Sequence, residues 1–297
     1  MWDPDLIFDT SKNYFTEHVG ERVLAPTWGG YKDMKEIPLS LSYLQEAKRA
    51  GMKITPLLHN DFDLQETKKL LHDSGAVQNL ARQITATALV YDFDGWNLDF
   101  ENMDEADKFL YTKFIKTVSE KLHMHGKEIS VDITVNSNSP NWSLCYDRKG
   151  MAAYVDYEVI MGYDQTPGGS RYSGSVSSYS WLKHHIAMLL KQVPNNKLVL
   201  GLPFYTRIWT GKEGQAASSV LMMKQIKSLL GQNNIGLFWN PEDRQYVGIW
   251  EENGQTRKVW FEERRSLQEK VSLAHDYKLA GLAFWRYGFC LLYTSPS

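Results

Sequence analysis

The chain has 297 residues, and 33 lysines and arginines against 35 aspartates and glutamates give it a formal net charge of −2. This balance offers no basic surface for nucleic acid or anionic membranes, and we predict neither as a partner. Two cysteines are too few for a disulfide framework or a zinc cluster, and no apolar run reaches the ~18 residues of a membrane-spanning helix.

Short apolar runs alternate with helix-like segments along most of the chain. Strands are predicted over 22–28, 52–58, 94–100, 128–135, 157–163, 197–204 and 279–285. Helices are predicted over 39–51, 76–92, 106–126 and 178–193. Repeated strand–helix units indicate a mostly parallel sheet, and a truncated first strand near Met1–Pro4 would complete a (β/α)8 TIM barrel. A doubly wound sheet is disfavoured because no G-x-G-x-x-G turn follows an early strand.

One stretch, residues 206–270, interrupts this alternation. A helix-like segment at 219–231 is followed by two strand-like runs on either side of Asn253-Gly254, a dipeptide typical of tight hairpins. We therefore expect a small α+β insertion over 206–270, between the seventh and eighth strands.

Both ends of the chain look incomplete. We expect a catalytic barrel over 1–289 and a non-native tail over 290–297, because the last residues, CLLYTSPS, have no periodicity. The first residues lack the basic and apolar regions of a signal peptide. The localisation of the chain is left open by this fragment, and the full-length protein is expected outside the cell, in the cell wall or in the spore.

Three carboxylates lie in or beside one strand-like run, DGWNLDFE at 94–101, although strands usually avoid them. Alternation places Asn97, Asp99 and Glu101 on one face, which points inward in a barrel, with Glu101 at the carboxyl-terminal rim. We expect Asp99 to share a proton or hydrogen bond with Glu101, since two close carboxylates in a dry site cannot both ionise easily. The resulting acid suits glycosidic cleavage, although a purely structural cluster remains an alternative. Asp94, at the strand start, is expected to serve the turn or the barrel bottom.

The strand ends together resemble the family-18 glycoside hydrolases, whose fourth-strand signature is D-G-x-D-x-D-x-E. This chain reads D-G-W-N-L-D-F-E, with Asn97 in place of the middle Asp. The other motifs occur in the family's order: PTW (26–28), HNDFD (59–63), SPNWSLCYD (139–147), MGYDQ (161–165), GLPFYTRIW (201–209) and GLAFWRYGF (281–289). The chain looks most like the bacterial branch of spore-cortex-lytic and peptidoglycan N-acetylglucosaminidases, in which this Asn and a following Asn102 are usual.

The resemblance implies a role for each matched residue. Glu101 would be the proton donor, and Asp99 would orient the substrate acetamido group and hold the charge that develops on it. Tyr163 and Asp164 would contact the same group, and Trp285 would form the apolar floor under the −1 sugar.

A second set of residues is expected to bind or support the sugar chain. Asn97 should ease ionisation of Asp99, since it keeps the hydrogen bonds of an Asp and removes one charge. Arg207 could meet a lactyl or carboxylate group of a muramic sugar. Simple packing is the alternative for Trp28 and Met161. A structural turn is the alternative for Asn141 and Trp142, which lie on the loop after the fifth strand. The complete set is Asn97, Met161, Tyr205, Arg207, Asn141, Trp142 and Trp28.

The leading prediction is a retaining β-N-acetylglucosaminidase that hydrolyses β-1,4 GlcNAc linkages in peptidoglycan or spore cortex by substrate-assisted catalysis. The alternatives are a chitinase and a catalytically silent, lectin-like binder. We expect a monomer without cofactors whose partner is a GlcNAc polysaccharide. The segment His59–Asp63 carries possible ligands, but its mixed facing favours sugar hydrogen bonding or loop structure, so we predict no metal site.

Overall fold

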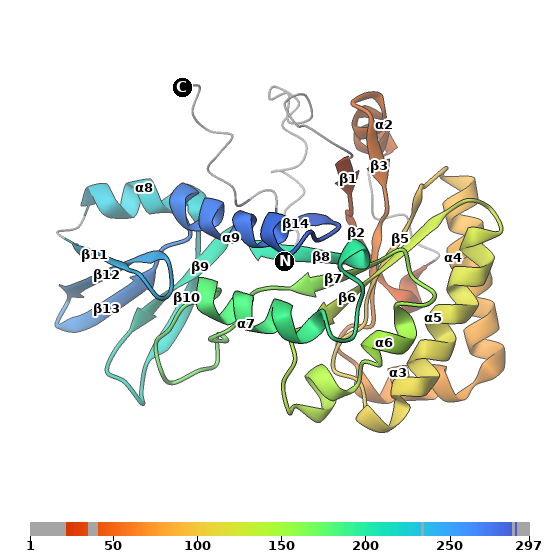
Figure 1. Ribbon diagram of the computed structural model, residues 1–297, viewed down its shortest axis with the longest axis horizontal. Coiled ribbons are helices and arrows are strands. Elements are labelled where there is room, and N and C mark those ends of the chain that lie inside the picture. Colours follow the sequence, from red (N-terminus) through yellow and green to blue (C-terminus); the bar gives the residue numbers. More distant parts are fainter. Residues whose placement is uncertain (1–21, 35–40, 233–234, 287–288, 290–297) are drawn as a thin grey trace. The chain divides into compact units, whose positions relative to one another are not determined.

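The computed structural model describes residues 22–34, 41–232, 235–286 and 289 (Figure 1). The chain divides into two compact units, the first of Met1–Val159 with Gln192–Lys197 and the second of Ile160–Lys191 with Leu198–Ser297. The strand expected near Met1–Pro4 and the tail expected over 290–297 lie outside the described residues. Closure of an eight-stranded barrel therefore stays a prediction. Within the described part, no helix is long and apolar enough to cross a membrane.

The first unit is built on parallel strands hydrogen-bonded in the order β2-β4-β5-β6-β7. Their bounds are β2 (Thr27–Gly30), β4 (Leu57–His59), β5 (Gly95–Asp99), β6 (Glu128–Thr134) and β7 (Tyr157–Met161), the last of which continues into the second unit. A separate parallel pair joins β1 (Arg22–Leu24) to β3 (Met52–Ile54). The runs expected at 22–28 and 52–58 are thus each split in two, because Pro26 and Pro56 lack the N–H that a continuous ladder needs.

Helices cover the outer face of this sheet. The expected helices are present with slightly different ends, as α2 (Leu41–Arg49), α4 (Ser74–Val90) and α5 (Lys108–His123), while α3 (Leu64–His72) and the short α6 (Arg148–Met151) were not predicted. The helices α4 and α5 lie side by side (Figure 1). From β5, Trp96 donates its indole N–H to the carbonyl of Ile84 in α4 at 2.9 Å, and the ring of Phe100 stacks on Tyr111 of α5. This outer packing leaves Asn97 and Asp99 on the opposite face of the strand.

The strand start also behaves as the sequence indicated. The Asp94 carboxylate accepts a hydrogen bond from the backbone N–H of Ile54 at 2.8 Å, and its carbonyl accepts one from Glu128 N at 2.8 Å. Asp94 therefore fastens neighbouring strands at the amino-terminal end of β5, away from Glu101.

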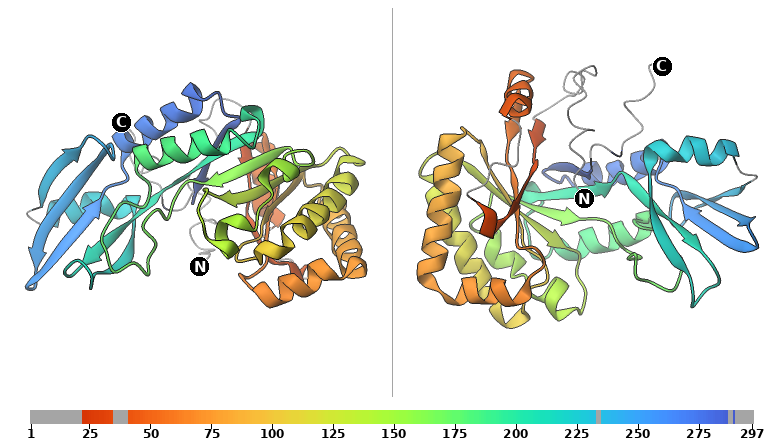
Figure 2. Two further views of the ribbon diagram at one scale, coloured as in Figure 1. Left: turned by 60° about the horizontal axis from the view of Figure 1, so that its bottom comes forward. Right: turned by 180° about the vertical axis from the view of Figure 1, so that it is seen from behind.

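The second unit continues the parallel strands in the order β7-β8-β14 and adds a five-stranded antiparallel sheet in the order β10-β9-β13-β12-β11. The strands of this antiparallel sheet are drawn in cyan to blue in both views of Figure 2. The parallel strands are β8 (Leu198–Pro203) and β14 (Gly281–Trp285), and the helices are α7 (Tyr179–Leu189), α8 (Met223–Gln232) and α9 (Arg264–Asp276). The antiparallel strands are β9 (Tyr205–Thr210), β10 (Ala217–Met222), β11 (Gly236–Asn240), β12 (Gln245–Glu252) and β13 (Gln255–Trp260).

The expected hairpin is confirmed. Asn253 and Gly254 join β12 to β13 with φ values of 53° and 74°, as a type I′ turn requires at both positions. The helix α9, which precedes β14, begins at Arg264 and so lies partly within the range 206–270 expected for the insertion. Its start carries a capping box between Glu263 and Ser266.

A fully buried ion pair joins α9 to the antiparallel sheet. The ammonium of Lys270 binds the carboxylate of Glu262, and both side chains are 0% exposed. Burial raises the pKa of Glu262 to about 7 and lowers that of Lys270, because desolvation disfavours both charges. The amide of Gln245 in β12 also donates to Glu262, and its oxygen accepts from Ser175 at 2.5 Å. Each buried polar side chain of this cluster therefore has its hydrogen-bond or ion-pair partner within the cluster.

Removing one partner of this pair should destabilise the protein strongly. Lys270→Met leaves a buried carboxyl without its cation, and we expect a loss of about 3–5 kcal/mol, measured by urea unfolding followed by tryptophan fluorescence. Adding Glu262→Gln, which keeps an oxygen for Gln245, should restore most of it. The matched control is Lys258→Met, whose partner Glu213 lies at 2.6 Å in a partly exposed pair and should contribute less than about 1 kcal/mol. Equal losses in the two single variants would contradict this account.

Candidate active site

The backbone of Glu101 is held by a side chain from the neighbouring strand. Asn60, which follows β4 and is 1% exposed, accepts from Glu101 N at 3.0 Å and donates to Glu101 O at 2.7 Å. Its amide nitrogen also lies 2.9 Å from Thr67 Oγ1 in α3. One residue earlier, the carbonyl of Phe100 accepts from the Tyr146 hydroxyl at 2.8 Å. A carboxamide carries both a donor and an acceptor, so Asn60 extends the β4–β5 pairing by one residue.

The residues after Glu101 are held as well. Asn102 adopts a left-handed conformation with φ of 51°, which Asn tolerates better than most residues, and its amide donates to the carbonyl of Phe62 at 2.8 Å. The backbone N–H of Met103 donates to the carbonyl of Asn141 at 3.0 Å. Loops after β4 and β6 thus fix the chain on both sides of Glu101.

Asp99 lies one strand position deeper and is strongly desolvated. Burial raises its pKa to about 6, and in the described part of the chain its Oδ1 is a buried acceptor without a hydrogen-bond partner. Asn97, only 5% exposed, donates its amide to Ser130 Oγ and to Asp132 Oδ1, both at 3.0 Å. The expectation that Asn97, compared with an Asp at this position, eases ionisation of Asp99 stays a prediction; burial opposes that ionisation, and Asp132 on the next strand is a second carboxyl that interacts with Asp99.

The second carboxyl, Asp132 on β6, was missed by the sequence analysis. It is 8% exposed, and burial together with Asp99 raises its pKa well above the usual range, with a smaller contribution from Glu101. Asp132 is thus a further acid whose charge Asp99 disfavours, and the expected sharing of a proton between Asp99 and Glu101 stays a prediction. The signal was available, because Asp132 interrupts the apolar run EISVDITV just as Asp99 interrupts its own strand.

Trp28 is a core residue. Its ring is 3% exposed and packs against Tyr91 at 5.8 Å and against Phe93 and Trp96 at 5.6 Å each, between ring centroids. The expectation that Trp28 forms a sugar platform is corrected accordingly, since the ring has no free face to offer.

An exposed pair of rings stands instead at the loops that hold Glu101. Trp142 is 42% exposed and Phe62 is 56% exposed, and their ring centroids are 6.0 Å apart. Phe62 was not among the predicted site residues. Asn141 contributes its carbonyl to Met103, and its amide lies 3.5 Å from Asn102 Oδ1. A sugar contact for Asn141 and Trp142 stays a prediction.

The polar segment after β4 has local structural roles. His59 Nδ1 lies 3.1 Å from Asp61 Oδ1, and Asp63 caps α3 by accepting from Glu66 N at 3.0 Å. Together with the Asn60 bonds, these contacts account for most of the segment. Within the described ranges no group of three or more His, Cys, Asp or Glu side chains is placed to hold a metal ion.

In the second unit, several predicted residues surround Asp164. The Tyr205 hydroxyl donates to Asp164 Oδ1 at 2.8 Å, and Arg207 Nη2 lies 4.0 Å from the same oxygen. Burial and the Asp164 carboxylate raise the pKa of Tyr205, so it remains a donor. The Tyr163 ring meets that of Tyr205 edge-on at 6.3 Å. Arg207 also donates to Ser218 at 3.3 Å. The side chain of Asp164 is 49% exposed, so its carboxylate is the accessible acid of this cluster.

Two predicted residues lie at strand ends of the same unit. Met161 ends β7 and is half-buried, and Trp285 ends β14 with 39% of its surface exposed. Their expected contacts with a sugar stay predictions.

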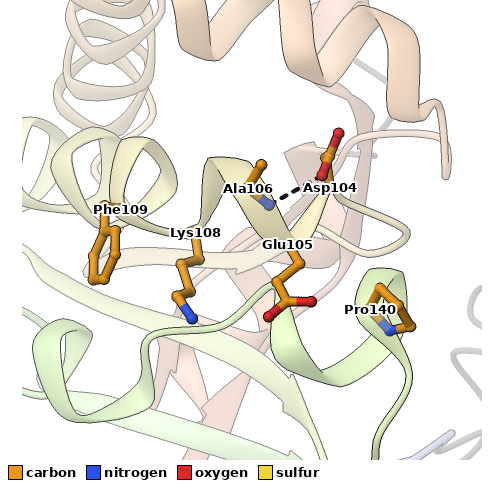
Figure 3. A pocket seen from close by; sticks show the side chains of 6 residues that line it. All are labelled: Asp104, Glu105, Ala106, Lys108, Phe109 and Pro140. Carbon is orange, nitrogen blue, oxygen red and sulfur yellow. Dashed lines mark hydrogen bonds between the residues drawn. The ribbon is translucent and has the colours of Figure 1, made fainter.

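A surface hollow of about 470 Å³ lies beside the start of α5 (Figure 3). Its acid Asp104 is already engaged, since it pairs with Lys68 at 2.7 Å and caps the turn at Ala106 N. None of the predicted site residues lines the hollow, and its remaining lining residues are Glu105, Lys108, Phe109 and Pro140. The predicted site therefore does not lie at this hollow.

Comparisons with known proteins agree with the arrangement on β5. The model of the glycosyl hydrolases family 18 matches residues 40–289. The chain is 26% identical over 255 residues to the uncharacterized glycosylase YvbX of Bacillus subtilis, covering 82% of this chain and 74% of that protein. It is 26% identical over 243 residues to the cortical fragment-lytic enzyme of the same species, covering 80% of this chain and 56% of that protein.

Solved structures share the fold. A chitinase from Chromobacterium violaceum aligns with a TM-score of 0.83 at 20% identity, covering 91% of this chain and 87% of that one. The spore cortex-lytic enzyme SleL of Bacillus cereus aligns with a TM-score of 0.82 at 22% identity, covering 90% and 64%. The described sheets agree with the TIM-barrel-like α/β fold that these likenesses indicate. With a family model that matches most of its length, this chain belongs to the glycosyl hydrolases of family 18.

Proposed function

We propose that this chain is a retaining β-N-acetylglucosaminidase that hydrolyses β-1,4 GlcNAc linkages in peptidoglycan or spore cortex. The observation that carries the proposal is Glu101, fixed by Asn60 at the end of β5 beside the buried acceptor Asp99. The similar proteins include a cortical fragment-lytic enzyme, which supports a bacterial cell-wall substrate.

The chemistry follows from these two carboxyl groups and from the substrate itself. Glu101 donates its proton to the glycosidic oxygen as the bond from that oxygen to the anomeric carbon breaks. The carbonyl oxygen of the substrate N-acetyl group attacks the anomeric carbon and forms a cyclic oxazolinium ion, whose N–H and positive charge Asp99 stabilises. Water then opens this ion and gives a proton back to Glu101, with net retention of configuration. Family 18 is an exception to the two-carboxylate scheme, so carboxylate separation says nothing about stereochemistry here.

The two alternatives differ in substrate and in turnover. A silent binder of this fold commonly lacks the acid, whereas Glu101 is present. Digestion of spore cortex, vegetative cell wall and chitin side by side, with mass analysis of the products, tests the substrate. We expect wall fragments that end in reducing GlcNAc. Cleavage of chitin alone would make the protein a chitinase, and binding without cleavage of any polymer would make it a lectin-like protein.

Glu101→Gln should lower kcat at least about a hundredfold, because it removes the general acid and keeps the shape of the side chain. Affinity for a GlcNAc oligosaccharide, measured by calorimetry, should stay near that of the wild type. The control is Glu105→Gln, the same substitution farther along the connection to α5, which should leave turnover unchanged. Wild-type turnover by the Glu101 variant would refute the assignment of Glu101 as the general acid.

Asn60→Ala should lower kcat about tenfold or more with a small effect on KM, because it frees the peptide groups of Glu101 and misplaces the acid. Thr67→Val is the matched control. It removes the bond between Asn60 and α3 and keeps both bonds to Glu101, so it should cost about 1 kcal/mol of stability and little activity. If both variants lose the same activity, Asn60 acts only through general stability.

A further inference from the structure

The signature residue that this chain lacks on β5 has a counterpart on the next strand. The strands β5 and β6 pair in parallel as far as Leu98 and Val131, so Asp99 and Asp132 follow at matching positions on the same face. Asn97 connects the strands by donating to Asp132 Oδ1 at 3.0 Å. The chain therefore keeps two carboxyl groups at this depth, although Asn97 removed one from β5.

Two charges on this pair are disfavoured. Asp132 is 8% exposed and Oδ1 of Asp99 is buried, and desolvation raises the pKa of both carboxyl groups. Asp99 raises the pKa of Asp132 further, which favours a proton kept by one member of the pair. Because Oδ1 of Asp132 accepts the Asn97 amide, Oδ2 is the oxygen left for this proton. Asp99 Oδ1 is the buried acceptor that lacks a donor.

We propose that Asp132 is a positioning residue for Asp99: it keeps one proton in the buried pair and donates it as a hydrogen bond to Asp99, so that Asp99 carries the negative charge that meets the substrate acetamido group. This rests on the proposed function only for the identity of the substrate. The proton stays within the pair throughout the reaction, and no bond to Asp132 forms or breaks.

The groups that face the pair are few. On β5 these are Asn97 and Glu101, and on β4 His59, the register partner of Asp99, pairs with Asp61. On β7 the alternation of side chains places Tyr157 on the same face. On the helix side, burial raises the pKa of Tyr111 in α5, and the charges of Asp99, Asp132 and Glu158 raise it further. A phenol at such a pKa stays neutral at working pH.

The kinetic test compares two substitutions of Asp132. In the wild type, kcat should fall as the pH drops below about 6, because protonation of Asp99 removes its charge. Asp132→Asn keeps a neutral donor of the same shape and should leave this acid limb in place. Asp132→Leu removes the donor and should move the limb upward by about one pH unit, the size of one hydrogen bond to a charged group. Ser130→Ala, which removes the other acceptor of the Asn97 amide, should leave the limb unmoved.

A purely structural Asp132 would give a different pattern. An apolar side chain would then be tolerated with an unchanged pH profile, and only the melting temperature would move. That result, or an acid limb displaced equally by Asn and Leu, would overturn the proposal.

A second measurement does not depend on turnover. Carbon-13 NMR of carboxyl-labelled aspartate in the wild type, Asp99→Asn and Asp132→Asn should show that removal of either acid changes the titration of the other by more than about half a pH unit. Independent titration near the ordinary value of about 4 would overturn the proposal even in an active enzyme. Coupled titration in a protein that cleaves no GlcNAc polymer would leave the pair intact and remove the proposed function.

Discussion

The alternation of side chains along β5 is the constraint on which the candidate site depends. Its outer residues, Trp96 and Leu98 with the following Phe100, are all 0% exposed and are fixed against α4 and α5. A shift of one residue would expose these rings and bury the acids among the helices. The hydrophobic packing on one face therefore determines where Asp99 and Glu101 lie on the other. The position of the site thus depends on buried apolar residues that take no part in the reaction.

The two acids are treated differently by their surroundings. Glu101 follows β5, where Asn60 holds its backbone and the loops after β4 and β6 hold the residues beside it. Burial disfavours the charge of Asp99, and in the proposal above a proton kept by Asp132 allows Asp99 to carry it. Two positions along the chain thus separate the acid that we propose gives a proton to the substrate from the one that we propose remains an anion beside it.

Polar side chains also extend the sheet beyond its regular ladder. Asn60 imitates a strand residue beside Glu101, and Asn97 connects β5 to β6 from within the face. Both are amides, which carry a donor and an acceptor without a charge and so satisfy buried peptide groups and carboxylates without adding repulsion. In the second unit Tyr205 has a comparable function, because its hydroxyl holds Asp164 while its ring is buried.

Much of the arrangement could be read from residue patterns. The strand–helix alternation, the hairpin at Asn253-Gly254 and the acids of β5 are local signals, since each depends on periodicity or on one turn. The split strands at Pro26 and Pro56 were equally readable, because proline interrupts a ladder wherever it stands. Trp28 was misjudged for a different reason: the sequence does not say which face of a strand end packs against Phe93 and Trp96.

The amino-acid sequence by itself determined the family, the identity of the proposed acid and the face on which it lies, because these follow from a motif and from two-residue alternation. Only the tertiary structure decided that Asp132 is an acid whose pKa burial and Asp99 raise and that Asn60 holds the backbone of Glu101. Both contacts join residues on adjacent strands far apart in the chain, with Asn60 and Glu101 separated by 41 positions. Strand order and register bring such residues together, and neither is written in the local pattern of one segment.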